Sequence, residues 1–83
     1  MLGQQLWTGR TGADVWFKRG LANAKKGDAA GAIADYTRAI EINPGWSQAY
    51  LSRGVARDQT GDLEGAIADY TKAIEIDFWS DSA

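Results

Sequence analysis

Hydrophobic and small residues recur along four segments of the chain at the spacing of an α-helix. In the segment 29–42 they fall at positions i, i+1, i+4, i+7 and i+8, which share one face of a helix. These residues are Ala32, Ile33, Tyr36, Ala39 and Ile40. Similar spacing over 13–26, 47–60 and 63–76 predicts three more helices.

Turn residues separate the predicted helices. Gly27-Asp28 and Gly61-Asp62 stand inside the two helix pairs. Glycine readily takes the left-handed conformation that ends a helix, and aspartate accepts a hydrogen bond at the start of the next one. Asn43-Pro44-Gly45 separates the second helix from the third, because proline cannot occupy a helix interior. The last stretch, 77–83, is expected to form a separate tail.

The N-terminal stretch 1–12 shows weak periodicity and contains three glycines, so we expect a mostly irregular lead-in. Thr11 and Asp14 have the spacing of a capping box, which predicts that the first helix begins at Ala13. Trp7 is expected to pack on the first helices, because an exposed indole leaves a large apolar area in water.

An internal repeat relates the two halves of the chain. The segment 27–42 returns further along as 61–76, with most paired residues identical. A fixed period of about 34 residues indicates a repeat architecture. The pattern resembles the tetratricopeptide repeat. The residues that carry the resemblance are Trp16, Gly20, Gly27, Asp28, Ala32, Tyr36, Ala39 and Pro44 in the first unit, and Tyr50, Gly54, Gly61, Asp62, Ala66, Tyr70 and Ala73 in the second.

The resemblance implies an all-α fold of two antiparallel helix-turn-helix hairpins, stacked as a short right-handed α-solenoid. It divides the chain into an N-terminal lead-in at 1–12, a first unit at 13–46, a second unit at 47–80 and a C-terminal end at 81–83. Small residues should let the two helices of a hairpin approach closely. We expect Gly20 to face Ala32 in the first hairpin, with Tyr36 beside them, and the equivalent residues to do the same in the second.

Two arginines depart from the family pattern. Arg19 and Arg53 stand where the family usually has leucine. The antiparallel register allows them to pair with Asp35 and Asp69 across their hairpins. We expect partly exposed pairs, each contributing about 0–1 kcal/mol. Apart from this pairing, both aspartates are expected on solvent-facing sides of their helices.

The resemblance also implies that the first helix of each hairpin lines a concave groove that holds a peptide or a partner helix. The corresponding groove residues here are Phe17, Leu21, Lys25, Leu51, Val55 and Gln59. The commonest specialised groove clamps a carboxylate with lysine and asparagine. Because Phe17 and Leu21 stand at those positions, we do not expect such a clamp.

Charge differs between the two kinds of helix. The first helices of the hairpins carry a net positive charge, and the second helices with their capping aspartates carry a net negative charge. Since complementary charge guides encounter, this asymmetry favours an apolar to weakly acidic protein or peptide partner. Ordinary solvated charge would explain the same distribution.

Two units are few for a solenoid, which normally needs about three units and polar caps. The aromatic tail could fold back on the last helix, a second copy could stack on it, or the chain could be part of a longer array. We expect a homo-oligomer, and the tail is also a candidate to dock in a neighbouring groove. The candidate self-association residues are Trp7, Tyr70, Phe78 and Trp79. A charge at Ala68 or Lys72 would test stacking.

Composition excludes several function classes. The chain has no histidine and no cysteine, so we expect no catalysis, no metal and no cofactor. The net charge of -2 disfavours a nucleic-acid partner. No apolar run approaches the length of a membrane span, and no signal peptide is evident, so a soluble cytoplasmic protein is expected. The predicted function is protein–protein interaction or self-assembly. The alternative is a purely structural or engineered repeat, or a fragment of an array, with no groove ligand.

Overall fold

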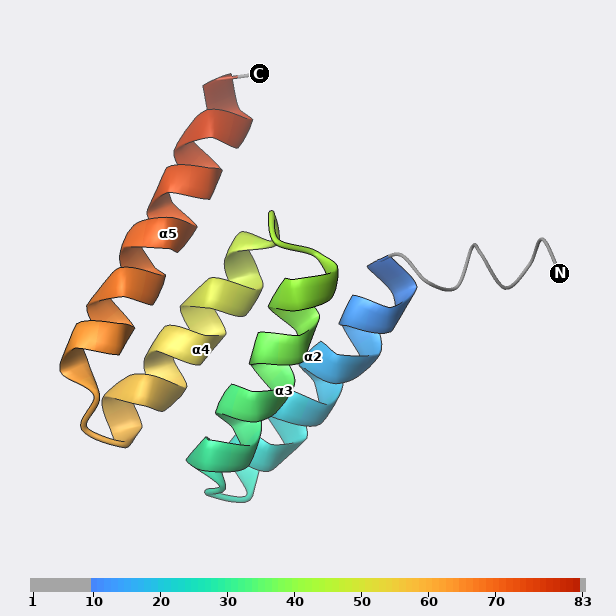
Figure 1. Ribbon diagram of the computed structural model, residues 1–83, viewed down its shortest axis with the longest axis vertical. Coiled ribbons are helices and arrows are strands. Elements are labelled where there is room, and N and C mark those ends of the chain that lie inside the picture. Colours follow the sequence, from blue (N-terminus) through green and yellow to red (C-terminus); the bar gives the residue numbers. More distant parts are fainter. Residues whose placement is uncertain (1–9, 83) are drawn as a thin grey trace, which may run out of the picture.

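Within residues 10–82, four α-helices follow one another, and each packs against the next (Figure 1). The computed structural model describes residues 10–82. The helices are α2 (Arg10–Lys25), α3 (Ala29–Ile42), α4 (Ser47–Gln59) and α5 (Leu63–Ser82). The pairs α2–α3 and α4–α5 form hairpins, and α3 packs on α4 to join them. No strand occurs within the described residues, so the all-α fold of two paired hairpins is confirmed.

The turns inside the hairpins use the predicted residues. Gly27 and Gly61 have φ angles of 86° and 87°, in the left-handed region that favours glycine. Asp28 then caps α3, its Oδ1 accepting a hydrogen bond of 2.9 Å from the backbone N–H of Gly31. Asp62 accepts the equivalent bond at the start of α5. The internal repeat therefore preserves the turn chemistry as well as the helices.

Both outer helices are longer than the sequence predicted. α2 begins at Arg10, three residues before the predicted start at Ala13. α5 continues to Ser82, so the expected separate tail is wrong and residues 77–82 form the last turns of a helix. The stretch after Ile76 lacks the proline and glycine that follow α3, which leaves nothing to stop the helix. The candidate residue Trp7 lies outside the described residues.

A small core sits where α2, α3 and α4 meet. Its largest fully buried side chain is Tyr36 of α3. A Cβ atom added to Gly20 would lie 2.5 Å from Tyr36 Cε1, so the tyrosine ring occupies the space that the glycine leaves. Gly54 lies in the same way against Tyr70 and against the carbonyl oxygen of Ala66. The core residues are Ala13, Phe17, Ala32, Tyr36, Ala39, Ile40, Ala49 and Ala56.

Candidate functional site

An apolar hollow lies between α2 and α4, the first helices of the two hairpins. Its volume is about 270 Å³. Leu21 stands on the α2 side, Leu51 and Val55 stand on the α4 side, and all three side chains are exposed. The complete lining is Leu21, Ala24, Tyr36, Gln48, Leu51, Ser52, Val55, Ala56 and Gln59.

Four of the six groove residues expected from the sequence line this hollow, namely Leu21, Leu51, Val55 and Gln59. Phe17 does not: it is buried, and its ring centroid lies 4.6 Å from that of Trp46 and 5.5 Å from that of Tyr36. Trp46, just before α4, packs against it, so Phe17 contributes to the core and not to the lining of this hollow.

Lys25 is exposed and lines a neighbouring hollow on α2 instead, together with Lys18 and Leu21. It thus stands at the margin of the apolar hollow and supplies positive charge there.

Several lining residues were not identified as groove residues from the sequence, among them Tyr36, Gln48, Ser52 and Ala56. Tyr36 was assigned to the hairpin interior, yet it also lines the hollow. Gln48 lies three positions before Leu51, and Ser52 lies three positions before Val55, so this spacing places them on neighbouring parts of the same face of α4. Helical spacing from the two apolar residues is the signal that would have identified them.

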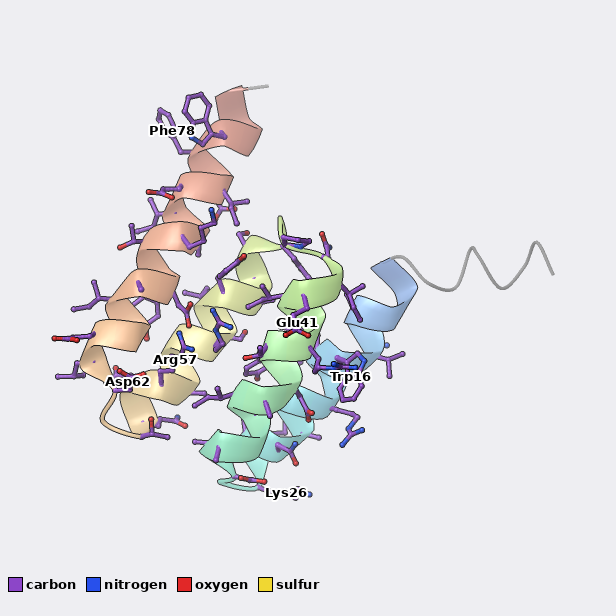
Figure 2. The ribbon with its side chains drawn as sticks, in the orientation of Figure 1. Trp16, Lys26, Glu41, Arg57, Asp62 and Phe78 are labelled. Carbon is purple, nitrogen blue, oxygen red and sulfur yellow. The ribbon has the colours of Figure 1, made fainter. Side chains whose placement is uncertain are left out.

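The candidate self-association residues lie on α5. Tyr70 is half-buried, whereas Phe78 and Trp79 are exposed and pack edge to face, with ring centroids 5.6 Å apart. Figure 2 shows Phe78 on the last turns of α5, which extend past the ends of the other helices. Exposed aromatic side chains that lie together on a helix are typical of a protein–protein contact surface.

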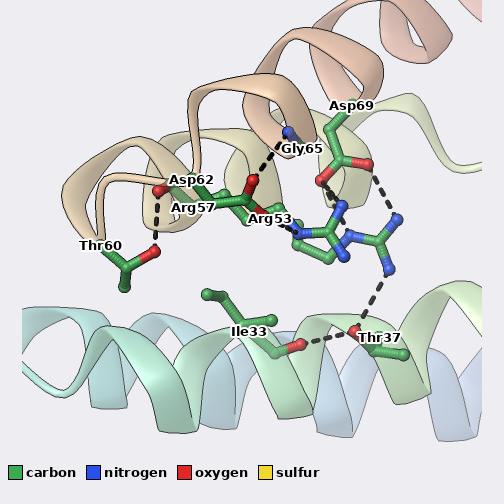
Figure 3. Close-up of polar contacts among 8 residues, drawn as sticks. All are labelled: Ile33, Thr37, Arg53, Arg57, Thr60, Asp62, Gly65 and Asp69. Carbon is green, nitrogen blue, oxygen red and sulfur yellow. Dashed lines mark hydrogen bonds and ion pairs between the residues drawn. The ribbon is translucent and has the colours of Figure 1, made fainter.

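A buried ion pair ties the second hairpin together and reaches the first (Figure 3). Arg53 of α4 donates two hydrogen bonds to Asp69 of α5, at 2.9 Å from Nε and 2.8 Å from the terminal nitrogen. Arg57 donates a third, at 3.0 Å. Arg53 also donates to the Thr37 hydroxyl of α3 at 3.2 Å, and that hydroxyl donates to the Ile33 carbonyl oxygen. Arg53 therefore connects three helices.

The burial of this pair corrects two expectations. Only 4% of the Asp69 side chain and 14% of the Arg53 side chain are exposed, so the pair is not the partly exposed one that the sequence predicted. Asp35 is buried as well, so neither aspartate faces solvent. Both aspartates instead point into their own hairpin and accept hydrogen bonds from its first helix.

The equivalent pair in the first hairpin is much looser. Asp35 accepts a hydrogen bond of 2.8 Å from Asn23, the residue that corresponds to Arg57. The Arg19 guanidinium is 3.8 Å from Asp35, and 63% of its side chain is exposed. Arg19 instead stacks over Trp16, at 5.0 Å from the ring centroid.

Burial raises the pKa of Tyr36, and the charge of Asp35 raises this pKa further.

Within residues 10–82, no group of three or more acidic side chains lies close enough together to hold a metal ion. No helix in that part of the chain is long and apolar enough to cross a membrane.

Solved structures of MamA resemble the fold. In one, the matched region is 32% identical with a TM-score of 0.83, and it covers 86% of this chain and 42% of the MamA chain. In another, the identity is 33% and the TM-score 0.76, with 84% and 38% of the two chains covered. The chain thus spans less than half of the length of these relatives. No curated protein matches the chain.

Family models agree with the internal repeat. Two models described as the tetratricopeptide repeat match residues 13–46 and 47–78 in succession. Each match covers most of one helix hairpin, including its glycine–aspartate turn and its glycine–tyrosine contact. The chain therefore belongs to the tetratricopeptide repeat family, and its two repeats form a module for protein–protein interaction or scaffolding.

Proposed function

We propose that this module binds an apolar segment of another protein, as a peptide or a helix, in the hollow between α2 and α4. The observation that carries the proposal is the convergence of three exposed aliphatic side chains, Leu21, Leu51 and Val55, on one concavity. Removing apolar surface from water contributes about 25 cal/mol per Å², so a partner that covers these side chains gains free energy from each.

The size and rim of the hollow favour a protein partner. Its volume of about 270 Å³ lies at the small end of ligand pockets, which suits one or two anchoring side chains. Gln48, Ser52 and Gln59 place hydrogen-bonding groups at its edge, where they can pair with the backbone of a bound segment. Lys25 at its margin favours an acidic residue beside the apolar anchors.

Selection of peptides from a random display library tests this function. We expect the selected peptides to carry aliphatic or aromatic anchors next to an acidic residue. Leu51→Glu should reduce their affinity more than tenfold, because a carboxylate would replace an apolar contact and repel the acidic residue. Ala68→Glu is the matched control, since Ala68 is exposed on α5 and remote from the hollow lining. Equal binding by the Leu51→Glu and wild-type proteins would refute the proposal.

A second candidate function is self-association through the outer face of α5. Leu63, Ile67 and Ile74 of this helix are all exposed, and together they form an apolar surface of the kind that marks a protein contact. Light scattering over a wide concentration range tests it: we expect the average mass to rise with concentration. A constant mass equal to that of one chain at millimolar concentration would refute it.

A further inference from the structure

Identical residues in the two repeats differ greatly in exposure on one face of the second helix. Ile40 of α3 is 8% exposed, whereas Ile74, its counterpart in α5, is 68% exposed. Ile33 is half-buried and its counterpart Ile67 is exposed. Since the residue types are the same, the difference in exposure arises from whether a neighbouring helix covers the face.

The helix that covers this face of α3 is α4. Ile40 belongs to the same core cluster as Ala49 and Ala56 of α4. Arg53, on the same helix, donates its hydrogen bond to Thr37 across this contact. The α3–α4 seam thus consists of isoleucines and a threonine on one side, and of small residues and an arginine on the other.

The outer face of α2 carries the same pattern as the face of α4 in that seam. Val15 is the counterpart of Ala49 in the first repeat, and it is 54% exposed where Ala49 is fully buried. Ala22, the counterpart of Ala56, is exposed. Arg19 is the counterpart of Arg53, and each stacks on the aromatic ring three positions before it. The two exposed edges of the fold, α2 and α5, therefore carry the two halves of the internal seam (Figure 1).

We propose that a second copy of this chain places its α2 on α5 as α4 is placed on α3, so that copies add head to tail. This proposal rests on the self-association proposed above and specifies its geometry. The Arg19 guanidinium of the added copy would donate to the Thr71 hydroxyl, as Arg53 donates to Thr37. Ile67 and Ile74 would be covered by the outer face of the added α2.

The loose state of Arg19 favours this contact. The Arg19 guanidinium lies 3.8 Å from Asp35, and 63% of its side chain is exposed. Arg19 can therefore donate to Thr71 without first breaking a short hydrogen bond to Asp35. Val15 is larger than Ala49, so the seam between copies would be wider than the internal one at that point. Because the two surfaces in contact differ, the association is heterologous and forms open chains or closed rings rather than a two-fold dimer.

Two variants block opposite edges of the protein. Ile74→Glu places a carboxylate on the outer face of α5, and Val15→Glu places one on the outer face of α2. Both positions are exposed, so far-UV circular dichroism should remain that of the wild type. Ala68→Glu is the matched control, because its counterpart Ala34 stays exposed although α4 packs on α3. Ala68 and Lys72 were chosen from the sequence to test stacking. Both lie off the seam, because their counterparts Ala34 and Arg38 stay exposed beside α4.

Sedimentation velocity of the single variants and of their mixture is the decisive experiment. We expect wild type and Ala68→Glu to form species larger than two chains, and each seam variant alone to sediment as one chain. An equimolar mixture of the two seam variants should form a two-chain species, because one unaltered seam remains between them.

The contrary outcomes separate this proposal from the one on which it rests. If the wild type stays a single chain at millimolar concentration, both proposals are wrong. If Ile74→Glu lowers the mass but the mixture forms no two-chain species, self-association through α5 stands and the head-to-tail geometry is wrong. If Val15→Glu alone keeps the wild-type mass, the role of α2 is likewise overturned.

Discussion

Replacing Asp69 by alanine should destabilise the fold more than any other removal of a charged side chain. The carboxylate accepts three hydrogen bonds of 2.8–3.0 Å from Arg53 and Arg57 in a nearly solvent-free position. Breaking a buried pair by removing one partner costs about 3–5 kcal/mol, because the other charge remains buried without compensation. We expect about 3 kcal/mol, the lower end of that range, since Arg57 is partly exposed and retains Asp62 at 3.9 Å.

The matched variant is Asp35→Ala in the first repeat. Asp35 is equally buried, but it holds one neutral donor, Asn23, and a loosely placed Arg19. Its removal should cost about 1–2 kcal/mol, the range for a hydrogen bond that leaves a buried donor unpaired. Urea denaturation followed by circular dichroism measures both free energies of unfolding. A smaller loss for Asp69→Ala than for Asp35→Ala would refute the assignment of Arg53 as the connection between three helices.

Three further predictions concern packing and titration. Gly20→Ala should cost about 1–3 kcal/mol, because the added Cβ would overlap the buried ring of Tyr36, whereas Gly45→Ala, which meets nothing within 4 Å, should be nearly neutral in the same denaturation assay. Gly27→Ala should cost about 1 kcal/mol, since its φ of 86° strains any side chain; equal stability to the wild type would contradict the turn assignment. The raised pKa of Tyr36 means that the folded state holds the proton more tightly, so its contribution is full below about pH 10 and is lost as the pH rises toward the folded pKa. Unfolding measured across the alkaline range should therefore show a steeper loss of stability for wild type than for Tyr36→Phe, and parallel curves would refute this.

Hydrophobic spacing and turn chemistry predicted the four helices, and the resemblance to the tetratricopeptide repeat implied their pairing into hairpins. The internal repeat and the residues Gly27 and Gly61 define two hairpins, because a left-handed glycine followed by a capping aspartate both ends and starts a helix. The extension of α5 was not predictable in this way. Proline or glycine would have marked the end of the helix, whereas their absence after Ile76 does not show where α5 ends.

Helical spacing predicts only part of the candidate site. Spacing shows which residues of one helix share a face, as Leu51 and Val55 do on α4, whereas the expectation that Leu21 of α2 lies beside them came from the family resemblance. It does not show which neighbouring element covers that face. Phe17 is one turn from Leu21, yet Phe17 is buried against Trp46 whereas Leu21 is exposed. The burial of Asp69 likewise depends on two arginines that converge from α4, a property of the hairpin register rather than of either helix alone.

Binding of an apolar protein segment in the hollow between α2 and α4 can be observed residue by residue. The ¹⁵N-labelled protein is titrated with a peptide selected from the display library, and the amide chemical shifts are recorded. We expect the largest shifts at Leu21, Leu51, Val55 and their neighbours in the hollow, and we expect Leu51→Glu to abolish them. Shifts concentrated on the outer face of α5, or an unchanged response in Leu51→Glu, would contradict binding in the hollow.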